Sequence, residues 1–68
     1  MKIFAQRLKE LRIQHNFSQQ YMADKLHIKQ QSYSRYELAT GEPSLAILRE
    51  IAILFNVSTD YLVGLSDI

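Results

Sequence analysis

The spacing of apolar residues along the chain predicts a succession of short amphipathic helices. Between residues 3 and 15, Phe4, Leu8 and Leu11 recur at intervals of four and three residues, which places them on one face of a helix. This pattern ends at Asn16, a residue type that tolerates the left-handed backbone common just after a helix. The first predicted helix therefore buries one apolar stripe.

The next two segments are predicted to be helices joined by a short link. Ser18 is a favourable N-cap for a helix over residues 19–26, and a third helix is expected over about residues 30–38. Residues 27–29 form the link between them. On the third helix, Tyr33, Tyr36 and Glu37 share one face, whereas the opposite face carries Gln30, Gln31, Ser34 and Arg35. We expect both tyrosines to pack toward the core and the polar face to be free for hydrogen bonding.

Two further helices are predicted after the loop that contains Gly41 and Pro43. Ser44 is placed to cap the fourth helix, whose apolar residues are Leu45, Leu48, Ile51, Ala52 and Phe55. Ser58 opens the fifth, whose regularity fails near Gly64. Because strict alternation of apolar and polar residues never lasts, no strand is expected. The sequence predicts an all-α fold of five short helices.

Composition narrows the class of protein. A chain of 68 residues has room for one small domain over residues 1–68, and 47% hydrophobic and 22% charged residues are typical of a folded chain. The absence of cysteine excludes disulfides and thiolate zinc sites and favours an intracellular protein. No apolar run approaches the roughly 20 residues of a membrane span. We therefore expect a cytoplasmic protein without a membrane partner.

The sequence offers little for catalysis or metal binding. His15 and His27 stand apart from any carboxylate or cysteine arrangement typical of a metal site. Two glycines cannot build a phosphate-cradling loop, and no set of nucleophile, base and orienting group is visible. We expect no enzymatic activity, no cofactor and no metal.

Charge is distributed unevenly along the chain. Residues 1–35 carry seven lysines and arginines against two acidic residues, a net charge of +5, whereas residues 36–68 carry one against five, a net charge of −4. A basic half suggests a polyanionic partner on one side of the molecule. Together with two helices joined by a short link, of which the second has an exposed polar face, it suggests a helix-turn-helix that binds the DNA major groove.

The residues themselves support a resemblance to a known family. The motifs that carry it are residues 18–37, Gly41–Leu45 and Phe55–Leu62, in this order and spacing. Over residues 3–64 the sequence resembles the lambdoid phage repressor and Cro type of helix-turn-helix domain, also called the XRE family. The resemblance implies a five-helix domain that binds operator DNA, commonly as a symmetric dimer, and regulates transcription.

The resemblance also implies roles for individual residues. Gln19 matches a glutamine that bonds a backbone phosphate and braces the start of the recognition helix, and Arg12 and Glu37 match an ion pair between the first and third helices. Base reading is expected from Gln30, Gln31 and Arg35, because glutamine can bond adenine N6 and N7 together and arginine can bond guanine O6 and N7. The expected phosphate contacts are Ser18, Gln19, Lys29, Ser32, Ser34, Thr40 and Ser44.

Four positions depart from the family pattern. His27 and Ala39 stand where relatives often have glycine, so a strained or adjusted backbone is expected at His27. Lys29 begins the recognition helix where a capping hydroxyl is more usual, which exchanges helix stability for a phosphate contact. Glu42 lies in a loop that is often basic, and this charge predicts modest phosphate affinity.

The favoured hypothesis is a sequence-specific transcriptional regulator, most simply a repressor, that binds a roughly palindromic operator as a homodimer. The expected dimer surface is an apolar strip of Tyr61, Leu62, Leu65 and Ile68, although Leu62 and Leu65 could instead close the core. A protein-interaction module, such as an adaptor or antitoxin-like partner, is the first alternative, and a binder of structured RNA is the second. The sequence does not identify the operator, the regulated genes or an inducer.

Overall fold

The computed structural model describes residues 1–68 and contains five α-helices and no strand. In chain order these are α1 (Lys2–Gln14), α2 (Gln19–Leu26), α3 (Gln30–Glu37), α4 (Leu45–Phe55) and α5 (Thr59–Val63). The all-α, five-helix prediction is confirmed. Helix α3 ends at Glu37, one residue before the expected end, and Leu38 forms its C-cap.

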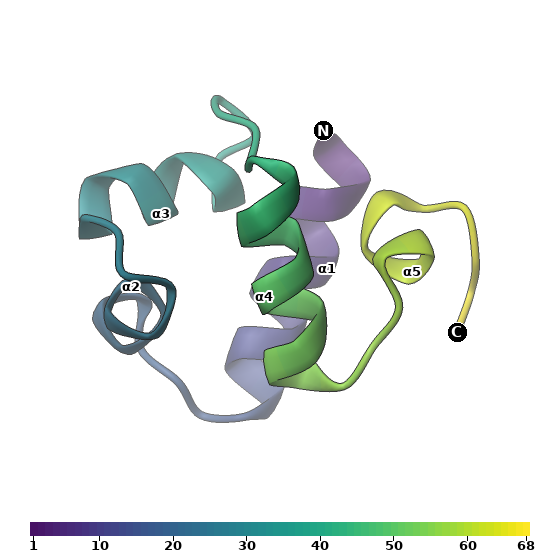
Figure 1. Ribbon diagram of the computed structural model, residues 1–68, viewed down its shortest axis with the longest axis horizontal. Coiled ribbons are helices and arrows are strands. Elements are labelled where there is room, and N and C mark those ends of the chain that lie inside the picture. Colours follow the sequence, from purple (N-terminus) through teal and green to yellow (C-terminus); the bar gives the residue numbers. More distant parts are fainter.

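Helices α1 and α4 form the centre of the molecule and the other helices flank them (Figure 1). Helices α2 and α3 lie together on one side, while α5 lies on the other beside the N-terminal turn of α1. The molecule measures 28 × 23 × 19 Å. No helix combines the length and apolar character needed to cross a membrane.

Side chains from all five helices build one apolar core. Phe4, Leu8, Met22, Tyr33, Ile51 and Leu62 are its largest fully buried members. The predicted stripe of α1 is confirmed, because Phe4, Leu8 and Leu11 are all buried. The stripe expected on α4 is wrong at its first position. Leu45 is 85% exposed, whereas Ile47 and Leu48 in the same turn pack against the core.

The helix boundaries follow from local chemistry. Ser18, Ser44 and Ser58 are N-caps whose hydroxyl oxygens accept hydrogen bonds from the backbone N–H groups of Tyr21, Ile47 and Tyr61. Four non-glycine residues adopt the left-handed conformation just after helices, namely Asn16, His27, Ala39 and Asn56. The adjusted backbone expected at His27 is therefore present, with φ of 57°.

The last helix corrects the predicted dimer surface. Leu62 is completely buried in the core, so it cannot contribute to an interface between protomers. Tyr61 is half-buried, and its ring lies 4.3 Å from the guanidinium carbon of Arg7. Only Leu65 and Ile68 stand free of the core, because α5 turns away from it at Gly64.

Candidate nucleic-acid interface

Helices α2 and α3 form the helix-turn-helix unit. The left-handed conformation of His27 ends α2, and Lys29 is the extended N-cap of α3. No side chain caps α3, so its first amides are free to approach an anion. This end of α3 lies at the edge of the molecule, opposite α5 (Figure 1).

The two faces of α3 have opposite environments. Tyr33 is completely buried, and Tyr36 packs against the core with its ring 6.3 Å from that of Phe4. Gln30, Gln31 and Arg35, on the other face, are all exposed. The helix therefore turns its apolar side chains inward and leaves its amides and guanidinium available to a ligand.

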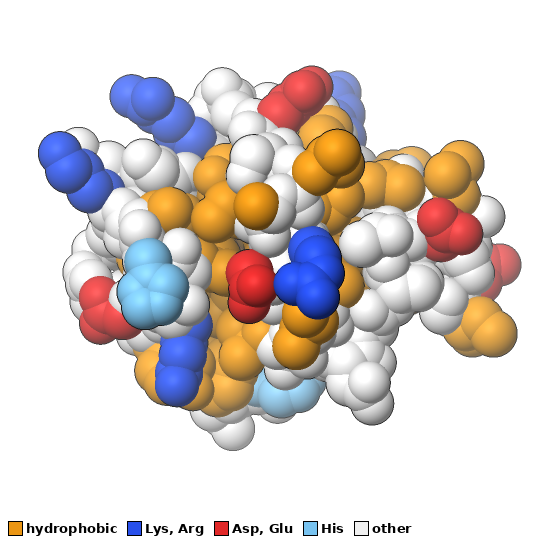
Figure 2. All heavy atoms as spheres, in the orientation of Figure 1, with side chains coloured by type: hydrophobic (Ala, Val, Ile, Leu, Met, Phe, Trp, Pro, Cys, Tyr) orange, Lys and Arg blue, Asp and Glu red, His pale blue; other side chains and the backbone are white.

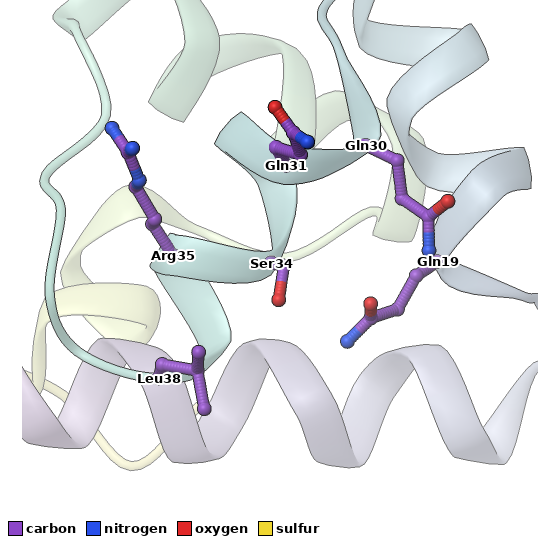
Figure 3. A pocket seen from close by; sticks show the side chains of 6 residues that line it. All are labelled: Gln19, Gln30, Gln31, Ser34, Arg35 and Leu38. Carbon is purple, nitrogen blue, oxygen red and sulfur yellow. The ribbon is translucent and has the colours of Figure 1, made fainter.

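The exposed face of α3 and the start of α2 enclose a shallow groove of about 580 Å³. Its lining residues are Gln19, Gln30, Gln31, Ser34, Arg35 and Leu38. In Figure 3, Gln19 and Gln30 lie at one end of this groove, Ser34 lies in the middle, and Arg35 and Leu38 lie at the other end. Five of the six side chains carry hydrogen-bonding groups, so the groove suits a polar ligand.

A buried ion pair fixes the back of α3 to α1. Arg12 Nε lies 2.6 Å from Glu37 Oε2, and Arg12 Nη2 lies 3.0 Å from Glu37 Oε1. Tyr33 donates its hydroxyl proton to the same carboxylate, and Gln19 donates from its amide at 3.2 Å. The Glu37 side chain is only 4% exposed. Four residues from three helices thus share one satisfied polar network.

This network changes the acid–base behaviour of its members. Burial by itself would raise the pKa of Glu37, but hydrogen bonds from Arg12, Tyr33 and Gln19 outweigh it and lower the pKa below its ordinary value. Burial raises the pKa of Tyr33, and its bond to Glu37 raises that pKa further. The hydrogen bond to Glu37 raises the pKa of Arg12. The pair therefore stays ionised, and Tyr33 stays protonated, across the neutral range.

Gln19 differs in one respect from its expected role. Its amide hydrogen-bonds Glu37 at the end of α3, and not a group at the start of that helix. It also lines the groove, so it links the exposed surface to the buried ion pair. The bracing that the resemblance implies thus acts at the far end of α3.

The proposed phosphate-contacting residues differ in how far they are exposed to solvent. Ser18, Lys29, Thr40 and Ser44 are exposed, while Ser32 and Ser34 are half-buried. Ser34 lines the groove but Ser32 does not, because it lies on the flank of α3 between its two faces. The structure therefore brings Gln19 and Ser34 together with the proposed base-reading residues and leaves Ser32 outside the groove.

Two residues with defined places in the structure were missed in the sequence. Leu38 lines the groove and is 68% exposed, although its apolar character suggested no such place. Arg7 resembled an ordinary surface charge, yet it donates hydrogen bonds to the backbone carbonyls of Tyr61 and Ser66. Its partners are more than 50 residues away in sequence, so no local pattern could have revealed them.

The surface charges agree with a polyanion bound on the α3 side. Lysine and arginine side chains project from the edge that carries α3, and two acidic side chains stand at the opposite edge beside α5 (Figure 2). No cluster of three histidine, aspartate or glutamate side chains that could hold a metal ion is present.

Comparison with known proteins agrees with this geometry. The family model described as Helix-turn-helix matches residues 8–62. The chain is 43% identical over 60 residues to the SPbeta prophage-derived uncharacterized HTH-type transcriptional regulator YonR of Bacillus subtilis (strain 168), covering 88% of this chain and 56% of that protein.

Two further relatives come from the same organism. The chain is 39% identical over 62 residues to the HTH-type transcriptional regulator ImmR, covering 91% of this chain and 49% of the relative. It is 45% identical over 58 residues to the HTH-type transcriptional regulator AnsR, covering 85% of this chain and 50% of the relative. The chain thus spans about half the length of the curated relatives it matches. It belongs to the Cro/C1-type helix-turn-helix family of DNA-binding domains, also called the XRE family, which are binding modules and not enzymes.

Proposed function

We propose that this chain is the sequence-specific DNA-binding domain of a transcriptional regulator and that α3 reads the major groove. One observation carries the proposal. The face of α3 that bears Gln30, Gln31 and Arg35 is exposed, while the opposite face is fixed by Tyr33 and the Arg12–Glu37 pair. A rigid helix with free amides on its outer face has the shape and the hydrogen-bonding groups that the major groove accepts.

The chemistry of the exposed groups sets the expected base contacts. A glutamine amide has a donor and an acceptor in one plane, which match adenine N6 and N7, and an arginine can donate twice to guanine. Gln30 and Gln31 belong to the first turn of α3, the part of a recognition helix that enters deepest. Arg35 lies one turn further along and contacts either a guanine or a phosphate.

Phosphate contacts set the register of the helix on DNA. Ser18 and Ser44 each begin a helix, where the backbone amides already favour an anion. Lys29 adds a positive charge at the uncapped start of α3. Gln19, Ser34 and Thr40 complete the set on this side, with Ser32 at its margin. These contacts position the domain, and the base contacts specify the sequence.

The proposed regulator is a cytoplasmic homodimer that represses transcription from a roughly palindromic operator. A two-fold axis would place the two α3 helices about 34 Å apart, one turn of DNA. The names of three relatives describe them as HTH-type transcriptional regulators, and one of these is prophage-derived, which supports a regulatory role.

Selection of bound sites from a random pool of duplex DNA tests the proposal. We expect enrichment of one half-site, repeated as an inverted pair with a fixed spacing. Enrichment of structured RNA in a parallel selection, or binding to no duplex at any salt concentration, would reject it in favour of an RNA-binding or protein-interaction module.

A further inference from the structure

One leucine stands among the polar side chains of the groove on α3. Leu38 is the one apolar residue of the six that line it, and it is 68% exposed. It belongs neither to the core nor to the partly buried residues that pack against the core. A single exposed leucine is ordinary on a protein surface. Its meaning here depends on its neighbours, which are side chains proposed to contact DNA.

Hydrogen bonds fix the backbone that carries Leu38. Leu38 is the C-cap of α3, and its N–H donates to the carbonyl oxygen of Ser34 at 3.0 Å. Two residues later, the N–H of Thr40 donates to the carbonyl oxygen of Arg35, also at 3.0 Å. Between them Ala39 adopts the left-handed conformation in which chains commonly leave a helix. The chain therefore turns directly after Leu38 and leaves its side chain in solvent.

Leu38 continues the face of α3 that carries the proposed base-reading residues. Gln31, Ser34 and Leu38 are spaced at i, i+3 and i+7, which places them in one row along the helix. In Figure 3, Leu38 and Arg35 lie at one end of the groove and leave the helix in different directions, so neither side chain covers the other. A ligand that contacts Ser34 in the middle of the groove can therefore also reach Leu38.

The edges of the DNA bases offer one apolar group in the major groove. All four bases present hydrogen-bond donors or acceptors there, and thymine alone adds a methyl group, at C5. Amide and guanidinium groups recognise the donors and acceptors. A leucine side chain has neither, so its favourable contact with a base edge is the burial of apolar surface.

We propose that Leu38 is a specificity-determining residue that contacts the C5 methyl group of a thymine in each half-site. The inference rests on the proposed function, in which α3 reads the major groove. The thymine lies toward the end of the half-site that Arg35 contacts, because Leu38 and Arg35 share one end of the groove. At this position Leu38 favours thymine over cytosine, which lacks the methyl group and presents an amino group instead.

Replacement of single thymines by deoxyuridine tests the contact, because the two nucleotides differ only in the methyl group. Each thymine in one half-site of the selected operator is replaced in turn, and binding is measured by titration. For the wild type we expect one position at which deoxyuridine weakens binding about fourfold, the loss of one buried methyl group. At that position Leu38→Ala should bind thymine and deoxyuridine about equally well, so the two changes are not additive in a double-mutant cycle.

Two further variants separate this contact from a general loss of affinity. Leu38→Met keeps apolar surface at the same place, so it should retain most of the preference for thymine. Leu65→Ala shortens an 80% exposed leucine outside the groove and should retain the full preference. The melting temperature of Leu38→Ala should equal that of the wild type, since Leu38 does not pack against the core.

The results separate failure of this contact from failure of the proposed function. If the wild type binds no duplex DNA, the proposed function fails and the contact fails with it. If the wild type binds its operator but no thymine gives an effect that depends on Leu38, the contact alone fails. A Leu38→Ala protein that binds every operator more weakly, and still loses fourfold with deoxyuridine, would place Leu38 against the sugars and phosphates and would also overturn it.

Discussion

At the scale of single residues, α3 alternates between side chains that are exposed for recognition and side chains that are buried in the core. Gln31 is exposed in the groove, and Tyr33, two positions later, is completely buried. Glu37 follows one turn after Tyr33 and accepts hydrogen bonds from three side chains. Recognition and stability are therefore separable by substitution within eight residues of chain.

Replacement of a groove glutamine should change specificity without changing stability. We expect Gln31→Ala to lose about 1 to 3 kcal/mol of discrimination at one base pair of each half-site, with an unchanged melting temperature. Gln20→Ala is the matched control, since Gln20 is exposed but bonds only Asp24 on its own helix. Competition titrations with single-base operator variants measure the effect. A drop in melting temperature for Gln31→Ala would contradict its exposed assignment.

Replacement of the buried carboxylate should do the reverse. Because the pKa of Glu37 is lowered in the folded state, its contribution is complete above the pKa of the unfolded chain and is lost as pH falls through the folded value. Glu37→Gln should cost about 2 to 4 kcal/mol at pH 7, since it strands Arg12. The free energy of unfolding in urea should also depend less on pH for the variant than for the wild type as pH falls below the ordinary glutamate pKa of about 4.3. If the free energies of unfolding of Glu37→Gln and of the wild type changed in parallel with pH, protonation of Glu37 would not be linked to folding.

At the scale of the elements, the caps explain why sequence reasoning found the helices. Serines precede α2, α4 and α5, and left-handed residues follow α1, α2 and α4, so both ends carry local signals. Helix α3 carries weaker signals, because Lys29 stands in place of a capping hydroxyl and the left-handed residue that follows the helix is an alanine, Ala39. Its end, expected at about Leu38, lies at Glu37, and Leu38 is the C-cap with its side chain in the groove.

The left-handed position after α3 offers a stabilising substitution. Ala39 has φ of 61°, a conformation that costs an alanine roughly 1 kcal/mol relative to glycine. We expect Ala39→Gly to stabilise the domain by about 0.5 to 1 kcal/mol, which raises the melting temperature by several degrees in thermal unfolding. Asn56→Gly should stabilise the domain by less, because asparagine tolerates the left-handed conformation better than alanine does. Equal gains at both sites would show that backbone strain is not the cause.

At the scale of the whole molecule, charge and topology divide the surface. The groove on α3 lies on the side of α2 and α3, and residues 64–68, which follow α5, lie on the other side. Helix α1 contacts both sides, because Arg12 pairs with Glu37 of α3 and Arg7 donates to the carbonyl oxygen of Ser66. One helix therefore sets the relative placement of the proposed DNA-binding face and the segment that follows α5.

Affinity for DNA should depend on salt in proportion to the phosphates neutralised. We expect Lys29→Ala to weaken binding to all sequences alike and to reduce the slope of log K against log salt by about 1 per protomer. Arg49→Ala removes a positive charge from the exposed face of α4. For this variant, the slope of log K against log salt should equal that of the wild type. Equal slopes for Lys29→Ala and wild type would remove Lys29 from the proposed phosphate contacts.

The sequence by itself determined the five helices, most of their ends and the polar face of α3, because periodicity and capping are local properties of the chain. It misplaced Leu45 and left Leu62 open between the core and a dimer surface, since spacing gives the face of a helix but not how far the core extends over it. Only the tertiary structure joined Arg7 to Tyr61 and Ser66, and Gln19 to Glu37. Those contacts depend on how helices meet in space, and no spacing within one segment encodes that meeting.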